Sequence, residues 1–203
     1  HLVTPEQFEF LEELYPEKFT ISYHRDMADY IYETEKLAKL SGRKYHGKKN
    51  HINKFMRLYP DWSYEPLSES NMEDCFQMAL EWRSQNGCND HEEKNEEMCV
   101  ALNALRLFRE LHLVGGVLRA GGRVVAFSIG EPATKDTMVV HIEKAFADVE
   151  GAYPMINQQF VIHEALEYKY VNREDDAGEE GLRQAKLSYH PAILLEKGTV
   201  KEK

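Results

Sequence analysis

The stretch from Tyr168 to Lys197, YKYVNREDDAGEEGLRQAKLSYHPAILLEK, decides how the chain is interpreted, because two predicted strands in it enclose a turn and a helix. Aromatic and β-branched residues alternate from Tyr168 to Asn172, which is typical of a strand. A polar turn follows, and a helical pattern begins at Leu182 and cannot pass Pro191. Ala192 to Glu196 then forms the second predicted strand.

Ionisable side chains crowd the corner between these two strands. Three acids follow Arg173, and cations, a phenol and an imidazole come soon after: Glu174, Asp175, Asp176, Arg183, Lys186, Tyr189 and His190. A solvated loop would also explain such charges. Both signs of charge converging on one corner nevertheless indicate a candidate site.

The run NREDDAGEEGLRQAKLSYHP (172–191) resembles the C-terminal signature of the bacterial DUF2156 proteins, which are similar to the C-terminal catalytic domain of phosphatidylglycerol lysyltransferase. The resemblance continues through RKYHGKKNHINKF (43–55), HIEKAF (141–146) and GAYPMIN (151–157), so it covers nearly the whole chain. It implies a GNAT-like fold, often duplicated in one polypeptide. It also implies kinship with enzymes that move an amino acid from aminoacyl-tRNA to an amine or hydroxyl acceptor.

The order of predicted elements agrees with that fold. From residue 62 onward turns and periodicity predict β-α-α-β-β-β-α-β-α-β, at 64–67, 70–82, 93–111, 114–119, 123–129, 137–146, 153–166, 168–172, 182–190 and 192–196. We therefore expect an α/β (α+β) fold of GNAT-like acyltransferase type, with a mixed central sheet and helices on both faces. We expect residues 62–203 to form this domain, as the second half of a tandem GNAT protein.

The first 61 residues predict other elements. Thr4 and Gln7 have the spacing of a capping box ahead of a helix that Pro16 follows, and strands at 21–23 and 28–32 are expected to pair. These elements are too few for a core, so residues 1–35 are interpreted as the remnant of a preceding GNAT-like domain and the chain as a fragment of a longer protein. Residues 36–61 would form a basic connecting helix, with Ile52, Phe55, Met56 and Tyr59 as its apolar stripe.

Composition bounds the class of protein. The 203 residues are 42% hydrophobic and contain no apolar run near the roughly 20 residues of a membrane span. The amino end lacks a secretory pattern, so we expect a cytoplasmic protein, with a peripheral location at the membrane as the alternative. Cys75 and Cys99 are expected as buried thiols, and Cys88 with His91 lacks the second pair that zinc needs, so no metal is expected.

Charge is distributed unevenly along the chain. The net charge of −10 argues against indiscriminate nucleic-acid binding, yet Lys36 to Pro60 holds no acid and eight of the 25 Lys and Arg residues. A solvated face is one interpretation, and a phosphate-binding patch for tRNA is the other. The candidate binding residues are Arg43, Lys44, Lys48, Lys49, Asn50, His51 and Lys54.

Two further candidates lie on the strand predicted at 137–146. His141 and Glu143 would share one of its faces, either as a structural pair or as groups in a substrate cleft. In a cleft, one of them could take a proton from an attacking amine. Tyr153, at the start of the next helix, could reach the cleft or belong to the core.

The resemblance assigns roles in the charged corner. Asn172, Arg173 and Lys186 are interpreted as catalytic, with cations there holding a phosphate of the tRNA end or of a lipid head group; Arg183 and Tyr189 would bind substrate. Glu174, Asp175 and Asp176 would receive a cationic amino acid. A salt bridge between these cations and acids is the structural alternative.

Three functions remain open from the sequence. The first is an aminoacyltransferase, which needs orientation, a base and oxyanion donors but no cofactor, because an ester is already activated. The second is a CoA-dependent N-acyltransferase, weakened because the turn Ala147 to Gly151 has one glycine and two acids where pyrophosphate would bind. The third is a non-catalytic RNA- or anion-binding module.

Overall fold

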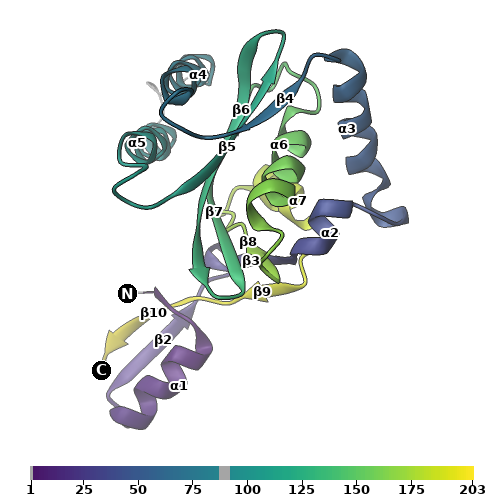
Figure 1. The fold of residues 1–203 in the computed structure, drawn as a ribbon. Helices are drawn as coiled ribbons and strands as arrows, with labels where there is room; N and C mark the ends of the chain where they lie inside the picture. Colours follow the sequence, from purple (N-terminus) through teal and green to yellow (C-terminus); the bar gives the residue numbers. More distant parts are fainter. Residues whose placement is uncertain (1, 87–91) are drawn as a thin grey trace. The chain divides into compact units, whose positions relative to one another are not determined.

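The computed structural model describes residues 2–86 and 92–203 of the chain (Figure 1), so the Cys88 and His91 pair lies outside the described residues. The chain divides into two compact units. The larger unit contains residues 34–171, and the smaller unit joins residues 1–33 with residues 172–203. The predicted boundaries at residues 35 and 61 stay a prediction, but the structure groups the last 32 residues with the first 33.

Antiparallel strands form the framework of the larger unit. Strand β4 (Ser63–Pro66) pairs with β5 (Val114–Ala120), β5 with β6 (Arg123–Thr134), and β6 with β7 (Thr137–Ala145). The predicted hairpin between β5 and β6 is confirmed, because Gly121 and Gly122 adopt φ values of 59° and 74° that favour glycine. Within this unit the strand order is β4-β5-β6-β7. Strand β8 (Tyr170–Asn172) lies at the end of the unit in the sequence.

Helices cover both faces of these strands, as predicted. Neighbouring residues of β7 show this: Lys144 reaches Glu97 of α5 (Glu92–Arg106) and lies 4.3 Å from the ring centre of Trp82 of α4 (Met72–Gln85). Glu143 points to the opposite face, where Asn157 of α6 (Ala152–Phe160) donates to it. A π-helical turn, Val161–Ala165, extends α6, and α6 also packs against α2 (Thr34–Lys39) and α3 (His46–Leu58).

The smaller unit brings together segments from both ends of the chain. Strands β1 (Leu2–Val3), β10 (Gly198–Glu202) and β2 (Phe19–Tyr23) form a three-stranded sheet, and α1 (Pro5–Leu14) lies beside it (Figure 1). The capping box predicted at Thr4 is confirmed. Strand β3 (Asp29–Glu33) pairs with β9 (Ile193–Leu195), and α7 (Glu180–Leu187) precedes β9.

The structure corrects several expectations. The strands predicted at 21–23 and 28–32 both form but do not pair with each other, because β2 pairs with β10 and β3 with β9. Helix α4, predicted from residue 70, begins at Met72 after the N-cap residue Asn71, and Met56 is 37% exposed rather than part of the buried stripe. Cys75 is buried as expected, whereas Cys99 is exposed because it lies on an outer face of α5.

Candidate active site

The loop from Asn172 to Glu179 joins β8 to α7 in the smaller unit, and side chains of its own fold it tightly. Asn172 accepts a hydrogen bond from the backbone N–H of Glu174 at 2.8 Å, Asp175 from Ala177 at 3.1 Å, and Asp176 from Gly178 at 3.0 Å. Each of these side chains therefore caps the backbone two residues later, which is what short Asn and Asp side chains do in turns. These contacts accompany positive φ angles at Glu174, Ala177 and Gly178.

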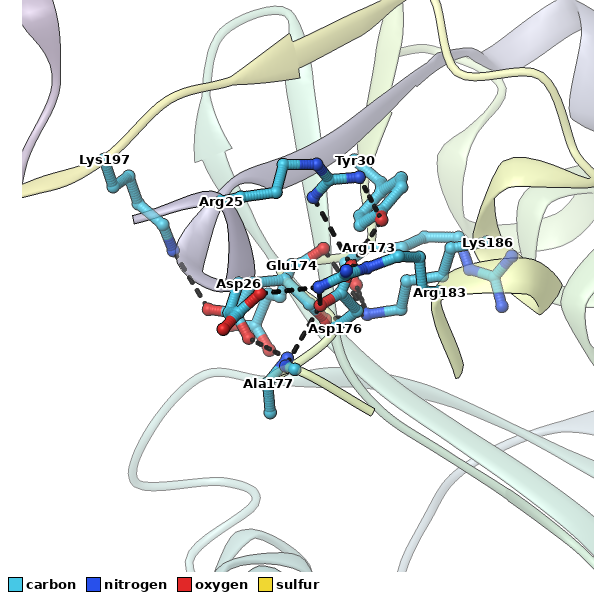
Figure 2. Close-up of polar contacts among 12 residues, drawn as sticks. Arg25, Asp26, Tyr30, Arg173, Glu174, Asp176, Ala177, Arg183, Lys186 and Lys197 are labelled. Carbon is cyan, nitrogen blue, oxygen red and sulfur yellow. Dashed lines mark hydrogen bonds and ion pairs between the residues drawn. The ribbon is translucent and has the colours of Figure 1, made fainter. Parts of the chain in front are cut away.

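Asp176 is the centre of this loop and is fully buried (Figure 2). It accepts hydrogen bonds from Nε and Nη2 of Arg183, both at 2.9 Å, from the Tyr30 hydroxyl at 2.5 Å, and from Nη1 of Arg25 at 3.4 Å. The Arg183 guanidinium, helped by Tyr30 and the Gly178 N–H, holds the pKa of Asp176 well below its usual range. The site therefore contains a carboxylate that is ionised at neutral pH and has a bidentate arginine partner.

Lys186 shapes the same loop from α7. The residue is 7% exposed, and its ammonium donates to the carbonyl oxygens of Arg173 at 2.7 Å, Glu174 at 3.4 Å and Asp175. Three consecutive carbonyls are thus turned toward one cation, which fixes the path of the backbone. Lys186, predicted as catalytic, thus contacts the backbone of the loop, and its catalytic role stays a prediction.

Arg173 stands at the start of the loop against two aromatic rings. Its guanidinium carbon lies 4.9 Å from the ring centre of Tyr189 and 5.8 Å from that of Tyr32. Tyr189, which was predicted to bind substrate, is 5% exposed, and its ring packs against the Arg173 guanidinium.

A second ion pair closes the other side of the loop. Lys197 lies 2.6 Å from Asp29 and 3.4 Å from Asp175, and Asn172 donates to Asp29 at 3.0 Å. Burial alone would lower the pKa of Lys197, but the hydrogen bonds and negative charges of Asp29 and Asp175 together outweigh burial and raise the pKa. Sequence reasoning missed Asp29 and Lys197, and also Arg25, Asp26 and Tyr30. An acid inside the strand predicted at 28–32 was the one available signal.

The remaining catalytic candidates lie in the larger unit. Glu143 is half-buried and accepts from Asn157 Nδ2 at 2.9 Å, whereas His141 contacts Glu131 at 3.0 Å. The strand register skips between Ile129 and Gly130, leaving His141 as the extra residue of a β-bulge. A bulge changes the direction of a side chain, so the strict alternation expected for His141 and Glu143 is interrupted.

Tyr153 lies in the first turn of α6 and is 38% exposed. Burial of its hydroxyl raises the pKa of Tyr153, although hydrogen bonds with the Ala145 backbone and Trp82 oppose the shift. The tyrosine is therefore neither wholly in the core nor fully in solvent.

The turn before α6, residues 147–151, packs closely against α3. A side chain at Gly151 would place its Cβ 2.4 Å from the His51 carbonyl oxygen, and the residue has a φ of 82°. Glu150 lies 2.6 Å from Lys54. Close packing and the exposed acids Asp148 and Glu150 make this turn a poor pyrophosphate site.

The basic segment, defined as Lys36 to Arg57, is carried by α2, a short 3-10 turn (Arg43–Tyr45) and α3. Ile52 and Phe55 anchor α3, and most of the predicted binding side chains are exposed: Arg43, Lys44, Lys49, Asn50 and His51. Lys48 is half-buried, Lys39 pairs with Glu35, and Lys54 pairs with Glu150. Glu35, directly before the segment, and Glu150, distant in sequence, thus neutralise part of its positive charge.

Within residues 2–86 and 92–203, no group of three or more His, Cys, Asp or Glu side chains is arranged to hold a metal ion. No helix in that part of the chain has the length and apolar character required to cross a membrane.

Comparison with solved structures identifies relatives of the fold. A conserved protein of unknown function from Bacteroides thetaiotaomicron is 41% identical, with a TM-score of 0.94 over 100% of this chain and 69% of that one. The DUF2156 C-terminal domain of a candidate lysylphosphatidylglycerol synthetase from Agrobacterium fabrum gives a TM-score of 0.71 at 14% identity, covering 98% of this chain and 66% of that one. L-PGS from Bacillus licheniformis gives 0.66 at 14% identity, covering 100% and 66%. The last two show a shared fold.

Sequence comparison gives the family. An uncharacterized protein from Mycoplasmoides gallisepticum, MYCGA3080, is 24% identical over 88% of this chain, which spans 57% of that relative's length. Residues 1–198 match the sequence model described as "Phosphatidylglycerol lysyltransferase, C-terminal". The chain therefore belongs to the family of phosphatidylglycerol lysyltransferase C-terminal domains.

Proposed function

We propose that the chain is an aminoacyltransferase domain that takes an amino acid from its ester with tRNA and passes it to an amine or hydroxyl acceptor, such as a lipid head group or a peptide. The observation that carries this proposal is the family match across residues 1–198, which includes every candidate site residue. The family's name supports an anionic phospholipid as the acceptor.

The reaction needs few chemical groups from the protein. The ester is already activated, so the acceptor's amine or hydroxyl can attack its carbonyl directly once the attacking group is deprotonated. A covalent thiol intermediate is disfavoured at Cys75, because burial raises the pKa of this thiol to about 12. The proposed mechanism is therefore direct attack assisted by a general base.

Glu143 is the proposed base. Its carboxylate is half-buried at the C-terminal end of β7, and the Asn157 amide, itself 2% exposed, fixes one of its oxygens at 2.9 Å. A carboxylate oriented in this way can accept the proton of an attacking hydroxyl or ammonium group.

Arg173 is the proposed phosphate ligand. Its guanidinium is held against Tyr189 and Tyr32, while Lys186 fixes the backbone on which it is carried. A planar guanidinium with a restrained position suits phosphate oxygens of the tRNA end or of a lipid head group. In this proposal Asp176, Arg183 and Lys186 position Arg173 and do not contact substrate.

The basic segment is the proposed contact for the tRNA backbone. Within the described residues Arg43, Lys49 and Arg57 form no ion pair, and all three are exposed. Cations on one helical segment attract phosphates without reading sequence, as expected for a tRNA that also serves translation.

A transfer assay tests the proposal. The protein is incubated with lysyl-tRNA carrying radiolabelled lysine and with vesicles containing phosphatidylglycerol, and labelled lipid is measured after extraction. Lipid labelling that is lost in Glu143→Gln and kept in Glu131→Gln supports the proposal. Binding of tRNA without lipid or amine labelling would favour the non-catalytic module. Transfer from an acyl-CoA in place of the tRNA ester would favour the N-acyltransferase.

A further inference from the structure

A cavity in the smaller unit lies outside the loop described above. Its volume is about 320 Å³, and its lining residues are Tyr23, His24, Arg25, Ala28, Leu194 and Glu196. This volume is at the lower end of the range of about 300 to 1,000 Å³ found for ligand pockets. The cavity is large enough for one small molecule.

One face of the β3 and β9 ribbon forms the floor. Leu194 lies directly opposite Tyr30 in the antiparallel register, so the two side chains point to the same face. Ala28 directly precedes β3 and Glu196 directly follows β9, and both line the cavity. The floor is therefore apolar at Ala28 and Leu194, with a carboxylate at Glu196.

Arg25 supplies the opposite charge. Its Nη2 donates to the Tyr30 hydroxyl at 2.8 Å and its Nη1 to Asp176 at 3.4 Å, while its side chain remains 41% exposed. A guanidinium has five N–H donors, so these two bonds leave donors for a ligand. The Tyr30 and Asp176 contacts also fix the direction of the guanidinium.

Arg25 and Glu196 line the same cavity without pairing with each other. Among the residues that the structure describes, Glu196 forms no ion pair or side-chain hydrogen bond. Opposite charges separated across a cavity complement a ligand that carries both charges. An apolar floor between them complements an aliphatic group.

We propose that this cavity binds a free α-amino acid with an aliphatic side chain, its carboxylate on Arg25, its ammonium on Glu196 and its side chain against Ala28 and Leu194. The ligand differs from the aminoacyl group of a tRNA ester, which has no free carboxylate. The site is thus additional to the proposed transfer reaction, and its test requires neither tRNA nor turnover.

Titration with L-leucine, followed by the backbone amide signals of the protein in NMR, tests the proposal. N-acetyl-L-leucine lacks the ammonium group and L-leucine amide lacks the carboxylate, so each should bind at least about tenfold more weakly. Glu196→Gln should weaken L-leucine binding about tenfold but leave N-acetyl-L-leucine binding unchanged, because that ligand has no ammonium group to pair with Glu196. Glu9→Gln, an exposed change on α1, is the matched control and should bind L-leucine as the parent does.

Three outcomes would overturn the proposal. L-leucine could fail to saturate the protein, it could bind no better than its two singly charged analogues, or Glu196→Gln could leave its affinity unchanged. Phosphoethanolamine provides a further arm, since it keeps the ammonium but replaces the carboxylate with a phosphate. Tighter binding of phosphoethanolamine than of L-leucine would reassign the cavity to a phosphorylated amine such as a lipid head group.

Discussion

The loop around Asp176 and the basic segment are both rich in charge, but their surroundings differ. In the loop each cation donates to defined oxygen atoms: Arg183 to a fully buried carboxylate and Lys186 to three carbonyls. In the basic segment, Arg43, Lys49 and Arg57 project into solvent. We infer that the charges of the loop fix its backbone conformation, whereas the exposed cations of the basic segment create a positive electrostatic potential. Single substitutions should therefore strongly affect the stability of the loop, and salt should affect phosphate binding by the segment.

The largest expected effect is on the buried carboxylate. Asp176→Asn removes the charge that partners Arg183 and Tyr30, and breaking a buried ion pair typically costs about 3 to 5 kcal/mol of unfolding free energy. Urea denaturation measures the change. Asp26→Asn is the control, because Asp26 also contacts Arg183 at 2.6 Å but is 60% exposed and should cost under about 1 kcal/mol. Equal stabilities for the two variants would contradict the distinction between buried and exposed pairs.

Glu143→Gln should act on rate rather than stability. Loss of a general base lowers transfer by a factor of about 100 or more, equivalent to about 2.7 kcal/mol in activation free energy. The amide keeps the size of the side chain, so the melting temperature should stay near that of the parent. Steady-state transfer and thermal melting measure the two effects separately. A variant that melts far below the parent while its specific activity is retained would show that Glu143 is structural.

Lys186→Met should lower both the free energy of unfolding and the transfer rate, whereas Glu143→Gln should lower the transfer rate alone. The substitution leaves the carbonyls of Arg173, Glu174 and Asp175 without their shared donor, and each buried group left unsatisfied costs about 1 to 3 kcal/mol. Because the loop would then release Arg173, transfer should fall as well. Urea unfolding and the transfer assay on the same preparation measure the two losses. Full stability with complete loss of transfer would instead indicate direct contact of Lys186 with substrate.

Acid should destabilise the loop through Asp176. Its folded pKa lies below the unfolded value, so between the two the unfolded chain binds a proton that the folded chain does not. The stabilisation is therefore present above the unfolded pKa and is lost as pH falls below about 5, by at most about 1.4 kcal/mol per pH unit for one proton. Unfolding free energies measured from pH 7 to pH 3 should show a shallower decline in Asp176→Asn than in the parent. Identical slopes would mean that other carboxyl groups dominate acid unfolding.

How much the sequence predicts depends on the distance between the residues involved. Helices and strands followed from local periodicity, and the candidates Arg173, Asp176, Arg183 and Lys186 lie within 14 residues of one another. The partner of Asp176, Tyr30, lies 146 positions away, and β2 pairs with β10 across a similar separation. No periodicity in one sequence encodes such pairings, so the strand order and half of the site could not be predicted. The sequence predicted a polar turn at this loop, and its charged residues were interpreted as a candidate binding site. The sequence did not show that Asn172, Asp175 and Asp176 cap the backbone of the loop.

Substitutions in the basic segment should have the smallest effect on the free energy of unfolding. They test whether its cations act through electrostatic attraction rather than by fixing the backbone conformation. If Lys44, Lys48, Lys49 and Lys54 contact tRNA phosphates, each contact releases counterions, so log affinity falls linearly with log salt concentration. Lys48→Gln with Lys49→Gln should weaken tRNA binding and flatten that slope by roughly one to two units. Filter binding across a salt series measures the slope. The unfolding free energy should change by less than about 0.5 kcal/mol, since surface substitutions away from packed or paired groups seldom do more. Lys18→Gln in the smaller unit, which removes an exposed cation that pairs with Glu202, should leave the slope unchanged. An unaltered slope in the double variant would assign the segment to solvation and remove the tRNA contact from the proposed function.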